Sequence, residues 1–511
     1  MATFTRLTTL FMTGAACAAL AACGADSTAD LANPGNTGSN PGTSTTSTTS
    51  TTTTSGGGTA NCPSQTTQVT VGTEQHCRLP ATLNANLTLP AGNIYQLNTR
   101  LDVGTNITGP AGVARTLTIA PGVTIYAANQ NAFINVNRGS QIIADGTVGQ
   151  PIIFTSAADL GYAGVLGLPT RAIYRGRTDR DPAGTTTGEW GGLVLNGLAP
   201  TNNPTRDGEG STGVIAGGTN AADNSGILRY VQIRYAGFDV GVATGGAAGV
   251  NELNGVAFQA VGNGTTVDYV QVHQGYDDCF EWFGGTVDAK HLICDGTSDD
   301  AFDWTDGWTG RAQFLLHIQN QNNVTGDTCI EADNLSSNNE ATPRSNPILS
   351  NLTCVGSAAS TTSITASGGT ALFRVGTGIR LYNAVISAAR QAALDIDGAS
   401  SYAQATAGNI VFRSIYITSA IQLATDSDDG PLPALFDAAG NNNLRTNLAA
   451  STLLPQVTGG VAYVNGSSET ARPVFNANGV STFFTTVSYI GAVQSTANNW
   501  TLGWTEFVNR S

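Results

Sequence analysis

The sequence Asp277-Asp278-Cys279-Phe280-Glu281-Trp282 recurs 22 residues further along the chain as Asp299-Asp300-Ala301-Phe302-Asp303-Trp304. A matched apolar strand precedes each copy, at 269–272 and at 291–294. A weaker third copy begins at Asp327, and a fainter fourth spans 393–396. Repeats with a period of about 20–50 residues are typical of solenoids, propellers or arrays. The middle of the chain is therefore built from similar, successive units.

The length of the repeat selects among these architectures. A propeller blade needs roughly 40–45 residues, whereas about 22 residues with several short strands fit one coil of a parallel β-helix, with coils about 4.8 Å apart. Outward from the repeat, from Leu79 onward, short apolar runs alternate with period two between Gly, Asn and Asp turns, which is typical of strands with one buried face. The predicted fold is all-β, a right-handed parallel β-helix.

Composition limits the kinds of partner. The 511 residues carry 22 Lys and Arg against 36 Asp and Glu, for a net charge of −14, and charged residues make up only 11%. This balance argues against nucleic acid, whose phosphates need clustered basic side chains, and against a polybasic membrane-surface binder. The hydrophobic content of 41% is too high for a wholly disordered chain.

The N-terminus has the pattern of a lipoprotein signal. Arg6 precedes an apolar, Ala-rich run that ends in Leu20-Ala21-Ala22-Cys23-Gly24. The run is too short for a permanent membrane-spanning helix, and the small residues before Cys23 suit a lipoprotein signal peptidase. The stretch resembles a bacterial lipobox, which implies cleavage before Cys23 and acylation of that residue, so that the protein is anchored in the outer membrane. An ordinary secretory signal with a chance cysteine is the alternative.

These observations give four segments. Residues 1–22 are the predicted signal peptide, and residues 23–60 are the acylated cysteine with a Ser/Thr/Gly-rich linker, predicted to be a disordered tether because such tracts cannot form a core. Residues 61–425 are the predicted β-helix domain. Residues 426–511 are predicted to be a C-terminal segment that packs on the solenoid.

Several motifs along the chain resemble those of one known family. They lie at 117–123, 138–144, 146–147, 151–156, 189–197, 284–290, 489–492 and 499–504. Together they resemble a large family of parallel-β-helix-like surface lipoproteins of Gram-negative bacteria. The resemblance covers most of residues 100–511 and implies a fold and a location at the cell surface. It implies no catalytic residues.

Six cysteines remain after the signal peptide and Cys23: Cys62, Cys77, Cys279, Cys294, Cys329 and Cys354. An even number in an exported protein indicates disulfides. Cys279 and Cys329 occupy one column of the repeat two coils apart, about 9.6 Å, which exceeds the roughly 7 Å limit for a bridge; His317 likewise separates Cys294 from Cys354. The favoured pairs are Cys279–Cys294, Cys329–Cys354 and Cys62–Cys77. Buried free thiols are the alternative for the inner four.

The repeat also stacks acidic residues. If Phe280 and Trp282 point inward, alternation turns Cys279, Glu281 and Asp303 outward. Carboxylates on adjacent coils repel one another, and a divalent cation would relieve that repulsion, because Ca²⁺ prefers six to eight oxygen ligands. The candidate metal ligands are Asp277, Asp278, Glu281, Asp299, Asp300 and Asp303. The competing interpretation is a solvated acidic face without a cation.

Catalysis is the second functional hypothesis. The Asp277-Asp278 and Asp299-Asp300 pairs resemble the paired aspartates of polygalacturonase-type hydrolases, but the Gly-His-Gly and Arg-Ile-Lys elements of that family are missing. Arg311 or Arg380 would be the base of a lyase. Trp190, Trp282, Trp304 and Trp308 offer sugar-stacking surfaces, although a place inside the coils is the favoured role of Trp282 and Trp304.

The sequence therefore predicts a lipid-anchored β-helix protein of the outer membrane or cell surface that binds glycans, Ca²⁺ or a partner membrane protein without catalysis. The alternative is a polysaccharide lyase or glycoside hydrolase that acts on acidic polysaccharide.

Overall fold

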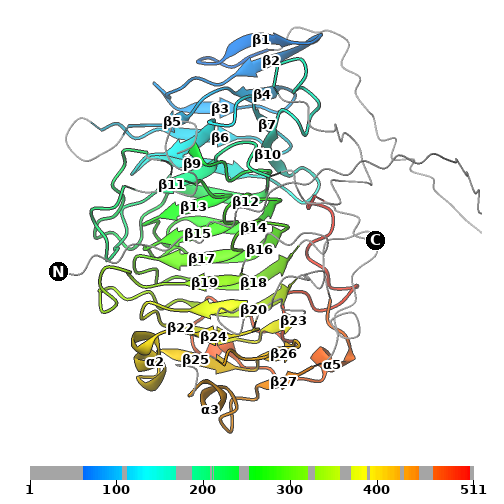
Figure 1. Cartoon of the computed structure of the whole chain (residues 1–511). Helices are drawn as coiled ribbons and strands as arrows, with labels where there is room; N and C mark the ends of the chain where they lie inside the picture. Colours follow the sequence, from blue (N-terminus) through cyan, green and yellow to red (C-terminus); the bar gives the residue numbers. More distant parts are fainter. Residues whose placement is uncertain are drawn as a thin grey trace, which may run out of the picture. The chain divides into compact units, whose positions relative to one another are not determined.

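The computed structural model describes residues 61–105, 112–168, 187–207, 210, 212–240, 252–319, 328–356, 370–387, 392–425, 431–447 and 464–506. Chain contacts separate residues 1–54 from a compact unit of residues 55–511. The predicted signal peptide, Cys23 and the whole of the predicted linker lie outside the described residues. Within the compact unit the strands stack in successive parallel coils (Figure 1).

Nine strands of the described residues form one continuous parallel sheet, here called sheet B. Each strand belongs to a different coil, and each pairs with the strands of the coils before and after it. In stacking order they are β5 (Leu101–Val103), β8 (Phe133–Val136), β11 (Gly192–Asn196), β13 (Val256–Gln259), β15 (Phe280–Phe283), β17 (Phe302–Thr305), β19 (Ile330–Ala332), β21 (Ala371–Phe373) and β24 (Asp395–Ile396).

The other eighteen strands form sheet A, which supplies the other two faces of each coil. They are β1 (Thr67–Val71), β2 (Glu74–Arg78), β3 (Leu87–Leu89), β4 (Ile94–Leu97), β6 (Thr116–Ile119), β7 (Thr124–Ala127), β9 (Gln141–Asp145), β10 (Ile152–Ser156), β12 (Gly226–Arg234), β14 (Thr266–His273), β16 (Ala289–Asp295), β18 (Arg311–Ile318), β20 (Ile348–Val355), β22 (Ile379–Tyr382), β23 (Val385–Ser387), β25 (Ile410–Arg413), β26 (Tyr416–Thr418) and β27 (Leu444–Thr446). β9 and β10 pair with opposite halves of the long strand β12, and β22 and β23 likewise pair with the two halves of β20.

A sharp bend divides each long strand of sheet A. The residue at the bend has a positive φ in every one: Tyr230, Tyr269, His291, Phe314 and Asn351, with φ between 49° and 65°. Bulky residues rarely adopt this left-handed conformation. Here the rings stack on one another, with centroids 4.4 Å apart for Tyr230–Tyr269, 4.1 Å for Tyr269–His291 and 4.7 Å for His291–Phe314. Contacts between coils therefore support a strained backbone position.

The repeat register is confirmed. Phe280 pairs with Phe302 and Trp282 with Trp304 on neighbouring strands, and all four rings are buried in the interior of the coils. Phe280 stacks on Phe302 at 5.8 Å. Trp282, however, stacks on Trp308 at 4.3 Å rather than on Trp304, because Trp308 also points into the core from the turn after β17.

Non-repetitive elements close the two ends of the stack. At the N-terminal end β1 and β2 form an antiparallel hairpin, the one departure from parallel pairing among the named strands. At the other end the helix α3 (Leu432–Phe436) buries Leu432 and Phe436 against the last coil. The parallel ladder continues to β27, one strand beyond the boundary predicted at residue 425. The other short helices are α2 (Ala399–Thr406), α5 (Ser467–Thr470) and the 3₁₀ turn η1 (Ala477–Gly479).

The C-terminal residues 464–506, here called the strap, cross the outside of sheet A. Buried side-chain amides hold the strap through its main chain: Asn383 exchanges two hydrogen bonds with Phe475 (2.9 and 2.8 Å), Gln313 two with Thr485 (2.9 and 2.7 Å) and Gln271 two with Glu506 (3.1 and 2.6 Å). Trp500 and Trp504 of the strap pack edge-on against the stacked rings at the bend. The strap is the described end of the segment 426–511 that the sequence predicts to pack on the solenoid; the domain bounds themselves stay a prediction.

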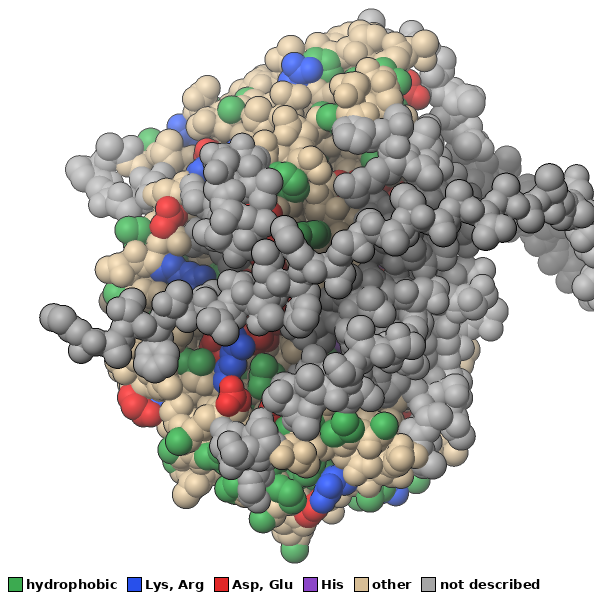
Figure 2. All heavy atoms as spheres, in the orientation of Figure 1, with side chains coloured by type: hydrophobic (Ala, Val, Ile, Leu, Met, Phe, Trp, Pro, Cys, Tyr) green, Lys and Arg blue, Asp and Glu red, His purple; other side chains and the backbone are tan. Residues whose placement is uncertain are grey.

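Charged side chains are few and scattered among uncharged ones on the face shown in Figure 2. Within the described ranges, no helix has the length and apolarity needed to cross a bilayer.

Candidate functional site

A column of outward-facing side chains runs along sheet B, and its middle part is acidic. Successive strands place Glu281 beside Asp303 and Asp303 beside Glu331. Their neighbours along each strand, such as Phe280 and Trp282, point into the core. The predicted outward orientation of Glu281 and Asp303 is confirmed. We call Asp277, Asp278, Glu281, Asp299, Asp300 and Asp303 the acidic ladder; β15, β17 and β19, which carry or adjoin it, lie one above another in Figure 1.

Cys279 does not follow the predicted alternation. It lies within the core instead of facing outward, because β15 begins only at Phe280 and the chain is still turning at Cys279. This inward position allows the bond to Cys294. The structure contains disulfides 62–77, 279–294 and 329–354, which are the pairs predicted from the sequence. His317 lies between Cys294 and Cys354 in the strand register, as expected.

The ligand atoms of the acidic ladder converge in two overlapping groups. One consists of Asp277, Asp278 and Asp299, the other of Asp278, Glu281 and Asp303, and within each group the carboxylate oxygens lie within 4.8 Å of one another. Asp278 belongs to both groups. The repeat thus brings together on two coils five of the six residues that the sequence predicts as metal ligands.

The acidic ladder is buried rather than solvated. Asp278 is 6% exposed and Glu281 5% exposed, and Asp277 and Asp300 are equally inaccessible, whereas Asp299 and Asp303 are partly exposed. The interpretation of a freely solvated acidic face is therefore wrong. Residues outside the repeat lie against the turn that carries Asp277: the Tyr276 amide donates to the Ala236 carbonyl at 2.9 Å. Their position does not follow from the period of the coils.

Hydrogen bonds orient three of these carboxylates. Asn254 Nδ2 donates to Glu281 Oε2 at 2.7 Å, and the Asp300 amide donates to Asp278 Oδ1 at 3.0 Å. Asp300 Oδ1 accepts from both the amide and the hydroxyl of Thr328 at 2.6 Å. Asp300 therefore holds the turn of the next coil in place, and it is the one predicted ligand outside the two converging groups.

Burial raises the pKa of the Asp278 carboxyl well above its ordinary value, and the neighbouring carboxylates raise it further, with Asp277 the largest contributor among them. Both causes oppose the charged form. A proton or a cation at this point would therefore relieve the electrostatic stress of the cluster.

The donor set fits Ca²⁺ geometrically. Oxygen ligands lie 2.3–2.6 Å from Ca²⁺, so two ligands on opposite sides of the ion are up to about 5 Å apart. The carboxylate oxygens of each group, which all lie within 4.8 Å of one another, meet that limit. All the donors are hard oxygens, which suit Ca²⁺ better than a soft transition metal.

Below the acidic ladder an arginine neutralises the column. Arg374, which directly follows β21, is ion-paired with Glu331 and with Asp333, the latter at 2.8 Å. This residue is absent from the sites predicted from the sequence, because 371–373 does not show the Asp-Asp-x-Phe pattern. The apolar run Ala-Leu-Phe at 371–373 aligns between the third and fourth copies of the repeat. This run is the sequence signal that would have located the coil that carries Arg374.

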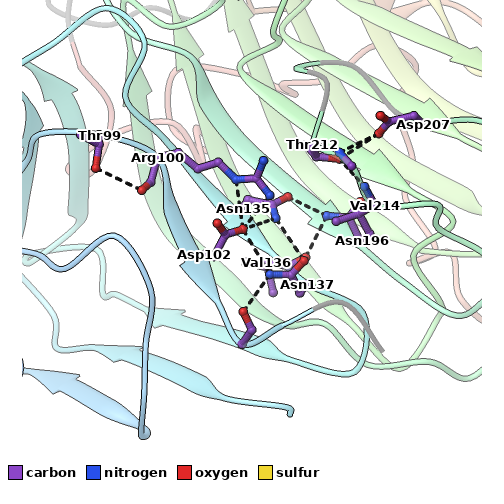
Figure 3. A network of polar contacts seen from close by, with 12 residues as sticks. Thr99, Arg100, Asp102, Asn135, Val136, Asn137, Asn196, Asp207, Thr212 and Val214 are labelled. Atoms are coloured by element: carbon purple, nitrogen blue, oxygen red, sulfur yellow. Dashed lines mark hydrogen bonds and ion pairs between the residues drawn. The ribbon is translucent and has the colours of Figure 1, made fainter. Parts of the chain in front are cut away.

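Above the acidic ladder the column consists mainly of asparagine side chains around one ion pair (Figure 3). Asp102 accepts from Arg100 at 2.7 Å and from Asn135 at 2.8 Å, and Asn196 donates to Asn135 at 2.9 Å. Asn137 donates to the same carboxylate at 3.3 Å. These side chains join β5, β8 and β11, so we assign the network a structural role between coils.

The two arginines that the sequence offers as the base of a lyase are not brought to the acidic ladder. Arg311 pairs with Asp288 and bonds Ser481 of the strap on sheet A, and Arg380 donates to Asn346. The four tryptophans Trp190, Trp282, Trp304 and Trp308 are all buried in the core. The proposed sugar-stacking role of these rings is therefore wrong, because alternation and the turn after β17 direct all of them inward.

Together these features define a parallel β-helix domain with an acidic stripe along one lateral face. The chain belongs to the family of pectate-lyase-like β-helix domains, which matches residues 81–168 and 180–505. This membership confirms the predicted parallel β-helix class; the lipoprotein part of the prediction stays a prediction.

Among solved structures, the catalytic domain of Agl-KA is similar, with 13% sequence identity and a TM-score of 0.32. The similarity covers 65% of this chain and 54% of that domain, so this chain spans about half of its length. A comparison with curated proteins finds no match.

Proposed function

We propose that this protein is an outer-membrane lipoprotein, anchored through acylated Cys23, whose β-helix domain binds polysaccharide with the help of Ca²⁺ held by the acidic ladder. The observation that carries the proposal is the convergence of Asp278, Glu281 and Asp303 within 4.8 Å on a buried lateral face. The family of pectate-lyase-like β-helix domains supports a polysaccharide as the ligand.

Electrostatics gives the reason for a cation. Two carboxylates about 4.8 Å apart repel by about 3.5 kcal/mol at an effective dielectric of about 20, and burial adds to the penalty. A divalent cation reverses the sign of these interactions and leaves coordination positions for the hydroxyl or carboxylate oxygens of a sugar. In this role the ladder binds the polysaccharide through the ion.

The test is thermal unfolding with and without Ca²⁺. Saturating Ca²⁺ should raise the melting temperature, because a ligand bound only by the native state stabilises it, and chelator should reverse the shift. Glu281→Gln with Asp303→Asn should abolish the response. The matched control is Asp145→Asn, which removes an exposed carboxylate of sheet A that pairs with Arg229. This variant should leave the response to Ca²⁺ unchanged. A melting curve indifferent to Ca²⁺ and chelator in the wild type would refute the cation site.

Polysaccharide binding is measured separately, by titrating the folded domain with a panel of neutral and acidic polysaccharides with and without Ca²⁺. Binding that requires Ca²⁺ and an intact ladder supports the proposal. Binding that is equal in chelator would assign the glycan to another surface.

Membership in the pectate-lyase-like family also favours a second function, cleavage of acidic polysaccharide by a lyase or glycoside hydrolase reaction. Asp278, Glu281 and Asp303 would then supply the acid and base. A lyase creates an unsaturated product that absorbs in the ultraviolet, and a hydrolase creates new reducing ends. Detection of either product with the wild-type protein, and its loss in Asp303→Asn, would show that the function is catalysis and not binding alone.

The anchor has its own test, which does not depend on the ligand. Cys23→Ser should release the protein from the membrane fraction and remove the lipid mass from its N-terminal peptide. Unchanged membrane association would overturn the anchor but not the cation site. An outer-membrane protein as the partner would appear as a cross-linked species that polysaccharide does not displace.

A further inference from the structure

A small pocket lies on the outer face of sheet B, two residues further along the strands than the acidic column. Its lining comes from β13, β15, the turn after β17 and the chain between β11 and β12. The floor is buried and includes Gln259, Phe283 and Asp306, whereas the rim is half-buried and includes Asn203, Arg206 and Ala216. None of these residues belongs to the acidic ladder.

The side chain of Gln259 points out of sheet B into this pocket. Its neighbour Phe258 packs in the core, so alternation turns Gln259 to the outer face. Gln259 is 2% exposed, and neither Nε2 nor Oε1 has a hydrogen-bond partner. Among the lining residues that the structure describes, Gln259 is the one whose buried polar atoms are left unpaired. Because an unpaired buried amide is costly, a group that pairs with it gains binding free energy.

The neighbouring strands supply no partner to this amide. On β11 the residue in register is Asn196, whose Nδ2 donates to Asn135 at 2.9 Å and to the Val136 carbonyl at 3.0 Å (Figure 3). The Oδ1 atom of Asn196 is likewise unpaired, so no bond joins the two amides. On β15 the residue in register is Phe283, which has no polar side-chain atom. The pocket is therefore the direction from which a partner of Gln259 can come.

The other polar side chains of the pocket bind one another. Asp306 accepts from Asn203 Nδ2 at 3.3 and 3.4 Å and from Arg206 at 3.4 Å. The Arg206 guanidinium also lies over the Phe283 ring, 4.3 Å from its centroid. These contacts hold the walls in place before a ligand arrives, which lowers the ordering cost of binding.

The unpaired amide selects the chemistry of the ligand. It offers N–H donors at Nε2 and an acceptor at Oε1. A carboxylate of the ligand would use only the donors and an ammonium group only the acceptor, whereas a hydroxyl group both donates and accepts. The size of the pocket selects the same group, because its volume of about 10 Å³ is room for one water-sized group.

We propose that the pocket at Gln259 receives one hydroxyl group of a bound polysaccharide. The inference rests on the proposed polysaccharide-binding function and deepens it, since it assigns a second contact to the same glycan. Ala257 is in register with Glu281 of the acidic ladder, and Gln259 follows two residues later, about 7 Å along the strand. A sugar unit beside the one held at the cation can therefore place a hydroxyl on Gln259.

The test is titration of the folded domain with polygalacturonate and with alginate in saturating Ca²⁺, each compared with its O-acetylated form. Acetylation blocks the ring hydroxyls and leaves the carboxylates that bind a cation. The wild type should bind at least one of the unmodified polymers, and acetylation of that polymer should weaken binding about tenfold, the effect of losing one or two buried hydrogen bonds.

Gln259→Met keeps the shape of the side chain without its amide. It should bind the unmodified polymer about tenfold more weakly than wild type and lose less affinity than wild type on acetylation. Its melting temperature should not fall, because an apolar group replaces an unpaired buried amide. Ala216→Leu, which narrows the pocket from its rim, should weaken binding as well. The control is Gln404→Met, which removes a buried amide of α2 that is bonded to Asn409 at 2.8 Å and should bind like wild type.

Three results would overturn the inference. Binding by Gln259→Met equal to that of wild type would assign only an ordered water to the pocket. Equal losses on acetylation in the two proteins would show that the hydroxyl contact lies elsewhere, and no binding of either polymer by the wild type would remove the contact altogether. The Ca²⁺-induced melting shift is read in the same variants, and its persistence in Gln259→Met separates failure of the pocket from failure of the acidic ladder.

Discussion

Replacing Gln313 by methionine tests how the strap is held. The Gln313 side chain is fully buried; its amide donates to the Thr485 carbonyl at 2.9 Å and to Asn351 Oδ1 at 3.1 Å, and it accepts from the Thr485 amide at 2.7 Å. Methionine has nearly the same length but forms none of these bonds. Each lost bond contributes about 0.5–1.5 kcal/mol net, so the two bonds to the strap contribute about 1–3 kcal/mol.

Hydrogen exchange at the Thr485 amide measures this directly, because that proton is the one bonded to Gln313. A loss of about 1–3 kcal/mol in local opening free energy corresponds to about 5- to 150-fold faster exchange. Global unfolding is a poorer assay, since a stack of coils need not unfold in a single step.

The control is Gln96→Met. Gln96 is another buried amide of sheet A, bonded to Tyr126 and Arg78 near the N-terminal hairpin, and its loss should leave Thr485 exchange unchanged. If Gln313→Met altered the exchange of Thr485 by less than twofold, the side-chain amides would not be what fastens the strap.

Three further outcomes are expected. First, because the pKa of Asp278 is raised in the native state, the native state keeps a proton that the unfolded state loses above about pH 4. The free energy of unfolding should therefore fall as the pH rises toward the folded pKa. Asp278→Asn should remove that slope and be more stable than wild type at pH 7 in chelator. Urea titrations from pH 4 to 8 check this, and an unchanged slope would contradict it. Second, Cys279→Ser with Cys294→Ser opens a link of sequence separation 15 and should lower stability by about 3 kcal/mol, whereas reductant should then have less effect than on wild type. Third, Arg374→Met leaves two partly buried carboxylates without their ion pair, so it should destabilise by roughly 1 kcal/mol at pH 7 and less at pH 4, where those groups gain protons.

The coil register could be predicted from sequence because the chain repeats itself. Phe280 and Phe302 occupy equivalent positions 22 residues apart, and parallel stacking of equal coils leaves no other register for them. The disulfide pairs of the inner four cysteines follow from the same alignment, since cysteines two coils apart are too distant to form a bridge.

The bends of sheet A could not be predicted, because propensity opposes them. Tyr269, His291 and Phe314 are residues that avoid positive φ, and the sequence marks the bend only by a step of three between inward-facing residues, as from Val267 to Val270. Only the three-dimensional stack of rings makes that conformation stable. Tertiary context therefore overrides the local preference at this position.

The burial of the acidic ladder also could not be predicted from the sequence. Alternation predicts which way Glu281 and Asp303 point, but not what lies over them. Asn254, which bonds Glu281, comes from the coil before and carries no motif.

The strap has a consequence for the synthesis of the chain. Coils accumulate in chain order from β12 to β23, but the strap runs back across them, from Phe475 beside Asn383 to Glu506 beside Gln271. A chain that emerges N-terminus first can thus stack its coils while the column of Tyr230, Tyr269, His291 and Phe314 still lacks its cover. A polypeptide truncated before residue 464 would display this row of aromatic rings to chaperones and proteases. Exposure of the rings would therefore distinguish an incomplete chain from a complete one.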